Sequence, residues 1–174
     1  MVKADIVTPG IKEIIALERW SEPRPVQKSV WTWFADPTTD GRDLIVSAPT
    51  AVGKTEAVFF PLIDRLAHAP GSQGYEILYI CPLKALIDQQ SHRLAPWAET
   101  KACGAFGLHG GTKRGTAESA RKTGGILVTT PESLEGVLHR NQAQTLLGPL
   151  RWVVIDELHA FCKRRFKNPQ KWRS

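Results

Sequence analysis

An alternation of short apolar runs with helical patterns constrains the fold of this chain more than any other feature. Five runs have the length and composition of buried strands, and the segments between them have helical character. The strands expected are Leu44–Ala48, Tyr75–Cys81, Ala102–Leu108, Gly125–Thr129 and Arg151–Asp156, and the helices are Lys54–His68, Leu83–Ala98, Lys113–Lys122, Ser133–His139 and Gln142–Leu147. This pattern predicts an α/β fold, a mostly parallel sheet covered by helices on both faces.

Two more helices are expected ahead of this alternating region. Apolar residues recur at helical spacing in residues 10–20, and again from Val26 to Phe34. Pro23 and Pro25 separate the two helices, because proline removes a donor and restricts the residue before it. Residues 36–41 are expected to form a turn before the first strand.

Composition excludes several classes of protein. The chain of 174 residues is 42% hydrophobic and 23% charged, which fits one soluble domain. No apolar run approaches the roughly 20 residues that a membrane span needs, and the N-terminus lacks the apolar core of a secretory signal. The three cysteines are widely spaced and form no C-x-x-C pair, so we expect reduced thiols in a cytoplasmic protein with no membrane partner.

The net charge of +6 belongs to the C-terminal end of the chain. Residues 163–174 hold six of the 23 Lys and Arg and none of the 17 Asp and Glu, so residues 1–162 are balanced. We therefore divide the chain into a domain at 1–162 and a basic tail of no clear structure at 163–174. Short basic tails are commonly solvated arms, so whole-chain charge is no evidence for nucleic-acid binding.

The stretch from Ser47 to Ala57 is a candidate phosphate-binding loop. It contains Gly53-Lys54-Thr55 between an expected strand and an expected helix. Backbone N–H groups at a helix N-terminus converge on a phosphate there, Lys54 would reach the β- and γ-phosphates, and the Thr55 hydroxyl would hold Mg²⁺. The alternative is an ordinary loop, because Ala48 stands where the general G-x-x-x-x-G-K-[ST] pattern has its first glycine.

The last expected strand delivers two adjacent acids, Asp156 and Glu157. An NTPase needs such a pair, since one carboxylate holds Mg²⁺ and the other orients or deprotonates the attacking water. The alternative is a pair of exposed acids at the start of the next helix. Ligands in open α/β sheets bind beyond the carboxyl ends of the strands, where this pair lies.

Six segments together resemble the motifs of superfamily 2 helicases of the DExH/DEAD type, in the Lhr-like (large helicase-related) group. They occur in the family's order between residues 20 and 159. They are Arg24–Gln27 (the Q-motif), Ala48–Ala57 (motif I), Cys81–Gln90 (motif Ia), His109–Thr112 and Thr129–Leu134 (the glycine pair and motif Ib), and Asp156–His159 (motif II). That family commonly begins motif I with Ala, which removes the objection to Ala48.

The resemblance implies the first RecA-like P-loop domain of an ATP-dependent helicase, with ATP and Mg²⁺ as cofactors. Gln27 would contact adenine, the backbone of Thr50, Ala51, Val52 and Gly53 with Lys54 and Thr55 would hold the phosphates, and Thr55 and Asp156 would hold Mg²⁺. Lys54, Asp156, Glu157 and His159 would be catalytic, and His159 would also link the nucleotide state to nucleic-acid binding. A surface histidine at a helix start is the alternative for His159.

The resemblance also implies a face that binds DNA or RNA through the backbone. Its residues would be Pro82, Leu83, Lys84, Gly110, Gly111, Thr130 and Pro131. Glycines and a helix N-terminus expose N–H groups to phosphates, so base sequence would not be specified. For each residue alone, a helix cap or a turn is an equal alternative.

The sequence departs from the family pattern in three places. Ala51 stands where many relatives have Gly, and a positive φ there would cost on the order of 1 kcal/mol. Gly10 stands where an aromatic residue precedes the Q-motif, and Trp20 is a substitute. From Cys162 the pattern ends, so we expect a domain truncated at its C-terminus and a chain of low or no activity. The alternatives are a non-catalytic nucleic-acid or partner-binding module and a split ATPase completed by a second chain.

Overall fold

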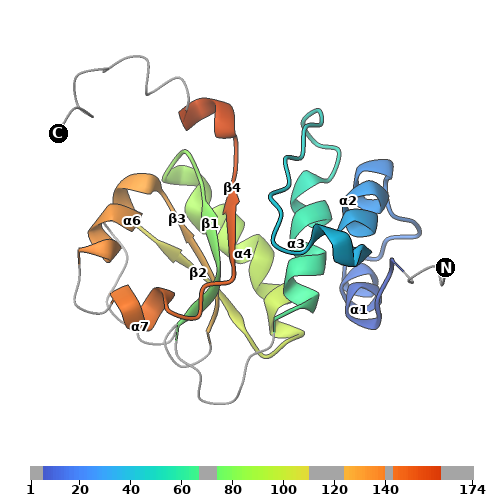
Figure 1. The fold of residues 1–174 in the computed structure, drawn as a ribbon, viewed down its shortest axis with the longest axis horizontal. Helices are drawn as coiled ribbons and strands as arrows, with labels where there is room; N and C mark the ends of the chain where they lie inside the picture. The colour runs from blue at the N-terminus through green and yellow to red at the C-terminus, as the bar shows by residue number, and fades with distance from the viewer. Residues whose placement is uncertain (1–5, 67–73, 110–123, 140–142, 162–174) are drawn as a thin grey trace. The chain divides into compact units, whose positions relative to one another are not determined.

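The computed structural model describes residues 6–66, 74–109, 124–139 and 143–161 (Figure 1). The chain divides into two compact units, Met1–Ala67 and His68–Ser174, called here the helical unit and the sheet unit. The expected single domain over 1–162 stays a prediction, and the expected tail at 163–174 lies outside the described residues.

The helical unit contains α1 (Pro9–Leu17), α2 (Pro25–Ala35), the short 3₁₀ helix η1 (Pro37–Thr39) and α3 (Lys54–Asp64). Proline occupies the first turn of α1, α2 and η1, where its missing N–H has no helical partner to lose. Thr8 caps α1 by accepting a hydrogen bond from the Ile11 amide. These helices confirm the periodicity read from the sequence, and α3 ends four residues before the expected His68.

Aromatic side chains form the core of the helical unit. Phe60 of α3 is fully buried and stacks on both Trp31 and Trp20, with ring centroids 5.9 and 5.4 Å apart. The Trp31 indole N–H donates to the Ala57 carbonyl over 3.1 Å, which pairs the polar end of a buried ring. The Thr8 hydroxyl donates to Asp64 over 2.7 Å and ties the start of α1 to the end of α3.

The expected strand at Leu44–Ala48 is wrong, because the segment forms neither a strand nor a helix. Among the described residues, the sheet contains only β1 to β4, so this segment has no ladder of hydrogen bonds. Its apolar side chains are not covered as a strand's would be, and Ile45 is 81% exposed. The apolar run has the composition of a strand, but strand formation also depends on a pairing partner elsewhere in the chain.

The sheet unit is built on four parallel strands in the order β2-β3-β1-β4. They are β1 (Tyr75–Ile80), β2 (Gly104–Leu108), β3 (Gly125–Thr129) and β4 (Trp152–Ile155). Every pair is parallel, with Tyr79 of β1 beside Val128 of β3 and Val154 of β4. All five residues of β3 are buried, as a central strand of a covered sheet requires.

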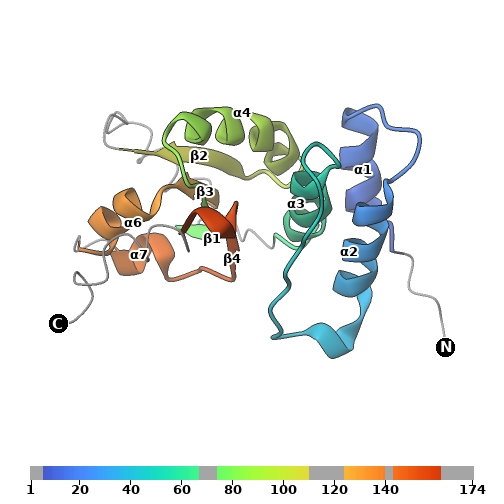
Figure 2. The same cartoon turned by 90° about the horizontal axis from the view of Figure 1, so that it is seen from above.

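Helices cover both faces of this sheet, as the sequence predicts (Figures 1 and 2). On one face lies α4 (Ala85–Glu99), which packs on β2 and β3. Gly107 of β2 allows this approach, since a Cβ there would lie 2.7 Å from an Ile87 methyl. On the other face, α6 (Pro131–Leu138) and α7 (Ala143–Leu147) bury Val137 and Leu146 against Leu78 and Leu127.

Two further expectations concern helices. The expected helix at Lys113–Lys122 lies outside the described residues. Every helix in the described part of the chain is too short or too polar to cross a bilayer.

Candidate functional site

The candidate phosphate loop turns into α3 at Gly53. This residue is the N-cap of the helix and has a φ of 93°, in the left-handed region that favours glycine. A Cβ at Gly53 would lie 2.5 Å from the Gln27 amide nitrogen, so a side chain here would force Gln27 to move. The start of the helix is therefore where the sequence predicts it, with Lys54 and Thr55 in the first turn, although no strand precedes the loop in the described part of the chain.

Ala51 adopts the positive φ on which its expected cost depends. Its φ is 60°, a conformation that a side chain with a Cβ occupies at about 1 kcal/mol or more. The Arg24 guanidinium donates to the Ala51 carbonyl over 2.8 Å and supports the loop at this point. Arg24 was not among the predicted site residues. Nothing in the sequence around it indicates a hydrogen bond to Ala51.

Lys54 lies along the loop that it would serve. Its ammonium donates to the carbonyl oxygens of Ala48 and Pro49, over 2.7 and 2.9 Å. Both acceptors are neutral, so these bonds leave the positive charge of Lys54 uncompensated. A phosphate anion would supply that compensation at the N-terminus of α3, where the helix dipole also favours negative charge.

The amide of Gln27 is buried beside the loop. Its oxygen accepts from the Arg24 amide over 2.7 Å, and its nitrogen makes no hydrogen bond within the described part of the chain. The side chain is 0% exposed, so an adenine contact requires it to turn outward. Trp20, the expected aromatic substitute, stacks on Phe60 in the core.

In the sheet unit, the strand ends bring three of the predicted motifs to one edge. The Cys81 amide donates to the Thr129 carbonyl over 2.8 Å, and the Asp156 amide to the Ile80 carbonyl over 3.0 Å. These bonds continue the ladder beyond the strands, because parallel strands share their carboxyl edge. Motifs Ia, Ib and II therefore meet at the edge where α/β sheets bind ligands.

The Asp156 carboxylate is held by two hydrogen bonds. Tyr79 donates its hydroxyl to Asp156 Oδ2 over 2.8 Å, and the Glu157 amide donates to Oδ1 over 2.9 Å. Burial, and then the nearby charge of Asp156, raise the pKa of Tyr79 above its ordinary value, so its hydroxyl stays protonated. Burial also raises the pKa of the neighbouring Cys81 thiol to about 12. Sequence reasoning missed Tyr79.

Glu157 occupies a strained position. Its φ is 49°, in a region sparsely populated by residues other than glycine and often found at functional sites. Its carboxylate lies 3.2 Å from His159 Nδ1, and both side chains are exposed. The structure thus brings together two of the residues predicted to be catalytic.

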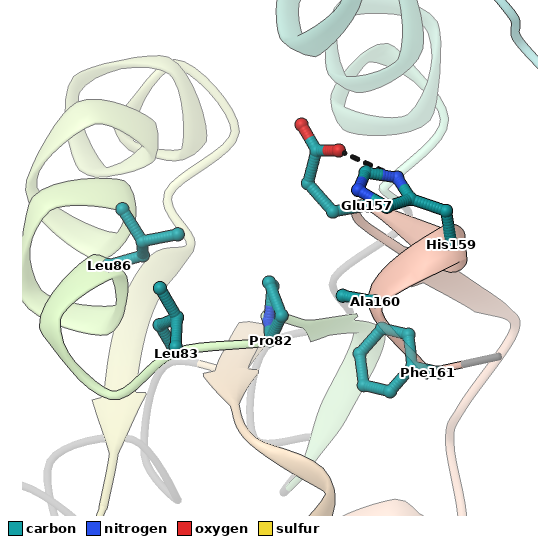
Figure 3. Close-up of a pocket in the computed structure, with 7 residues that line it drawn as sticks. All are labelled: Pro82, Leu83, Leu86, Glu157, His159, Ala160 and Phe161. Atoms are coloured by element: carbon teal, nitrogen blue, oxygen red, sulfur yellow. Dashed lines mark ion pairs between the residues drawn. The ribbon is translucent and has the colours of Figure 1, made fainter. Parts of the chain in front are cut away.

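A pocket of about 290 Å³ lies between the segment after β4 and the start of α4 (Figure 3). Its lining joins Glu157 and His159 to residues of the predicted nucleic-acid face. The lining residues are Pro82, Leu83, Leu86, Glu157, His159, Ala160 and Phe161. Pro82 and Leu83 thus face the residues predicted to act in catalysis and coupling, and Leu83 is 57% exposed.

The other predicted nucleic-acid residues differ in exposure. Lys84 is exposed ahead of α4. Thr130 is 1% exposed and caps α6 by accepting from the Ser133 amide over 3.4 Å, and Pro131 is the first residue of that helix. Thr130 therefore has the structural role of a helix cap, and Gly110 and Gly111 lie outside the described residues.

The chemistry of Thr55 and Asp156 fits Mg²⁺. The described residues contain no group of three or more His, Cys, Asp or Glu that could hold a metal. Mg²⁺ uses few protein ligands, since it keeps several waters and binds through one or two carboxylates and the substrate phosphates. A single carboxylate and a hydroxyl, both hard oxygen donors, match that preference.

A glycine-hinged loop that opens a helix at a lysine, and a parallel strand that ends in two acids, define a P-loop NTPase fold. The DEAD/DEAH box helicase model matches residues 24–172, and the chain belongs to this family. The family inferred from the motifs is therefore confirmed.

Relatives with longer chains share this fold. The chain is 33% identical to the Lhr helicase/probable uracil glycosylase of Mycolicibacterium smegmatis, over 81% of this chain and 10% of that protein. The ADP-bound RNA-helicase Prp28 of Chaetomium thermophilum is 22% identical, with a TM-score of 0.75 over 97% of this chain and 41% of its own. The helicase MrfA bound to DNA and AMPPNP is 25% identical, with a TM-score of 0.73 over 91% and 22%.

Proposed function

We propose that this chain is the ATP-binding part of a nucleic-acid helicase, in which ATP hydrolysis drives movement along DNA or RNA, or its unwinding. The observation that carries the proposal is the phosphate loop, where Gly53 bends with a φ of 93° and Lys54 opens α3. Such a loop directs N–H groups and a lysine toward one anion. The chain spans about a tenth of the Lhr relative and under half of Prp28, so the activity of a whole protein is a proposal.

The helical unit would hold the nucleotide. Backbone N–H groups of residues 50–53 would bind the phosphates, Lys54 would exchange its carbonyl partners for the β- and γ-phosphates, and Gln27 would turn to meet adenine. The ADP bound to Prp28 and the AMPPNP bound to MrfA support adenine nucleotides as ligands.

The sheet unit would supply the hydrolytic groups. Thr55 of the helical unit and Asp156 would hold Mg²⁺, which neutralises charge on the phosphates when bound. Glu157 would orient the attacking water and accept its proton, and His159, 3.2 Å from Glu157, would transmit the nucleotide state. The shared pocket supports this last role, because its lining joins His159 to Pro82 and Leu83.

The nucleic-acid face would be the carboxyl edge of the sheet. Pro82, Leu83, Lys84 and Pro131, with Gly110 and Gly111, would contact the backbone of the strand, and Thr130 would fix the start of α6 there. The MrfA structure bound to DNA, and the name RNA-helicase for Prp28, support nucleic acid as the partner.

We expect this chain, taken alone, to bind nucleotide weakly and to turn over little ATP, in a cytoplasmic setting. A split ATPase completed by a second chain is a second candidate. It is favoured by β4, which is the edge strand of the sheet in the described part of the chain and whose Val153 and Ile155 are 53% and 48% exposed.

Two measurements on the purified chain test the proposal. Binding of an ATP analogue, and salt-sensitive binding of a single-stranded oligonucleotide that survives deletion of residues 163–174, are the expected results. Equal nucleotide binding by wild type and Lys54→Ala would contradict the proposed function. Nucleic-acid-stimulated turnover of about 1 s⁻¹, lost in Lys54→Ala, would contradict the low activity expected of the isolated chain.

A further inference from the structure

Tyr79 is a buried polar residue in a strand next to the candidate catalytic edge. It lies in β1, between β3 and β4, and is 2% exposed. Its neighbours Ile77, Leu78 and Ile80 are aliphatic, so the strand itself requires only an apolar side chain here. A buried hydroxyl is tolerated where it finds a hydrogen-bond partner, and the partner of this one is Asp156.

The register explains how the hydroxyl reaches the carboxylate. Tyr79 pairs with Val154, and Asp156 follows two residues later on the same side of β4. The tyrosine ring therefore spans one diagonal step of the sheet and places Oη 2.8 Å from Oδ2. The Asp156 amide is fixed at the same time by the Ile80 carbonyl, over 3.0 Å.

Together these contacts define the orientation of the carboxylate. Tyr79 occupies one lone pair of Oδ2, and the Glu157 amide occupies one lone pair of Oδ1. Each oxygen keeps a second lone pair, so the carboxylate can still accept a metal or a metal-bound water. The direction in which it offers those lone pairs depends on both donors.

We propose that Tyr79 is a positioning residue for the magnesium-holding carboxylate of Asp156. It anchors Oδ2 from inside the sheet and leaves the remaining lone pairs of the carboxylate for the metal. The inference rests on the proposed function, since it assumes that Asp156 holds Mg²⁺. Groups that orient a metal ligand from behind are worth about tenfold or more in metal affinity.

The chain offers a matched control for the hydroxyl. Tyr75 is the only other tyrosine, lies in the same strand, is 4% exposed, and packs with Phe106 at a centroid distance of 6.3 Å. Tyr75→Phe and Tyr79→Phe therefore make the same chemical change in the same strand, and only the second removes a donor from Asp156.

The test is the Mg²⁺ dependence of nucleotide binding. A fluorescent ATP analogue is titrated into wild type, Tyr79→Phe, Tyr75→Phe and Lys54→Ala, first in EDTA and then at rising MgCl₂. We expect Tyr79→Phe to need about tenfold more Mg²⁺ for half of the Mg²⁺ effect, with unchanged binding in EDTA. Tyr75→Phe should match wild type, and Lys54→Ala should lose binding under both conditions.

The outcomes separate the two claims. A folded Tyr79→Phe with the Mg²⁺ midpoint of wild type would overturn the positioning role while the proposed function stands. A wild-type chain that binds no nucleotide, or no better than Lys54→Ala, would overturn the proposed function and this inference with it.

A second measurement leaves the hydroxyl in place, in case Tyr79→Phe does not fold. In the Tyr75→Phe background, 3-fluorotyrosine labels position 79 alone, because the chain has two tyrosines. We expect its ¹⁹F resonance to shift when Mg²⁺ is added to the nucleotide complex. An unchanged resonance, with nucleotide and Mg²⁺ bound, would contradict the inference.

Discussion

At the scale of single residues, the phosphate loop depends on two backbone conformations that side chains disfavour. Gly53 and Ala51 have φ values of 93° and 60°. The cost at Ala51 was predictable from the sequence, since glycine is common at that position in the family, but its support by Arg24 was not. The sequence indicates Tyr79 only as a hydroxyl inside an apolar strand. The strand register is needed to identify Asp156 as its hydrogen-bond partner.

Gly53→Ala should destabilise the helical unit more than Gly41→Ala. Both positions have positive φ, but a Cβ at Gly53 meets the Gln27 amide at 2.5 Å and one at Gly41 meets nothing within 4 Å. The two variants share the conformational penalty of about 1 kcal/mol, and their difference in urea unfolding measures the clash. Adding Gln27→Ala should recover part of that difference, and additive effects would contradict a direct clash.

Ala51→Gly should raise the free energy of unfolding by about 1 kcal/mol, because it removes the Cβ from a left-handed residue. Its control is Ala85→Gly at the exposed start of α4, where no positive φ is relieved. Thermal melts of both variants check the prediction. A melting temperature for Ala51→Gly at or below that of Ala85→Gly would show that the loop is not strained.

At the scale of helices and strands, local sequence patterns located most elements. They failed where strand formation depends on pairing with another segment. The expected strand Gly125–Thr129 is observed with the same bounds as β3, and apolar periodicity with the prolines between them placed α1 and α2 within a few residues. The apolar run at Leu44–Ala48 has the composition of a strand, but strand formation requires hydrogen bonds from another segment. The apolar pattern of one segment does not show whether another segment will pair with it.

Thr130→Ala should lower the free energy of unfolding by about 1 kcal/mol, because α6 loses the hydroxyl that accepts from the Ser133 amide. Thr130→Ser should restore most of the loss. Urea unfolding and hydrogen exchange at the Ser133 amide measure the effect. The control is Thr32→Ala, since the exposed Thr32 hydroxyl donates along its own helix to the Lys28 carbonyl. Equal stability of the two alanine variants would contradict the capping role.

At the scale of the whole molecule, two buried thiols couple stability to alkaline pH. Burial raises the pKa of Cys81 to about 12 and of Cys103 to about 11, from an ordinary value of 9. The folded chain therefore keeps these protons when the unfolded chain loses them. This stabilisation is fully present below pH 9 and is lost as pH rises through 11 and 12.

The free energy of unfolding should accordingly fall between pH 9 and 12, and the double variant Cys81→Ala, Cys103→Ala should show a shallower fall. Denaturant unfolding at a series of pH values measures both slopes. Alkylation at pH 8 followed by mass spectrometry gives a second check, since both cysteines should react only after unfolding. Rapid labelling of either in the folded chain would contradict their burial.

The central claim is that the loop before α3 binds the phosphates of ATP, and equilibrium binding of an ATP analogue tests it most directly. Lys54→Ala removes the ammonium that donates to the carbonyl oxygens of Ala48 and Pro49. Lys28→Ala removes an exposed ammonium from α2 of the same unit and is the control. We predict at least a tenfold weaker affinity for Lys54→Ala and an unchanged affinity for Lys28→Ala. Equal affinities for all three proteins would contradict the claim.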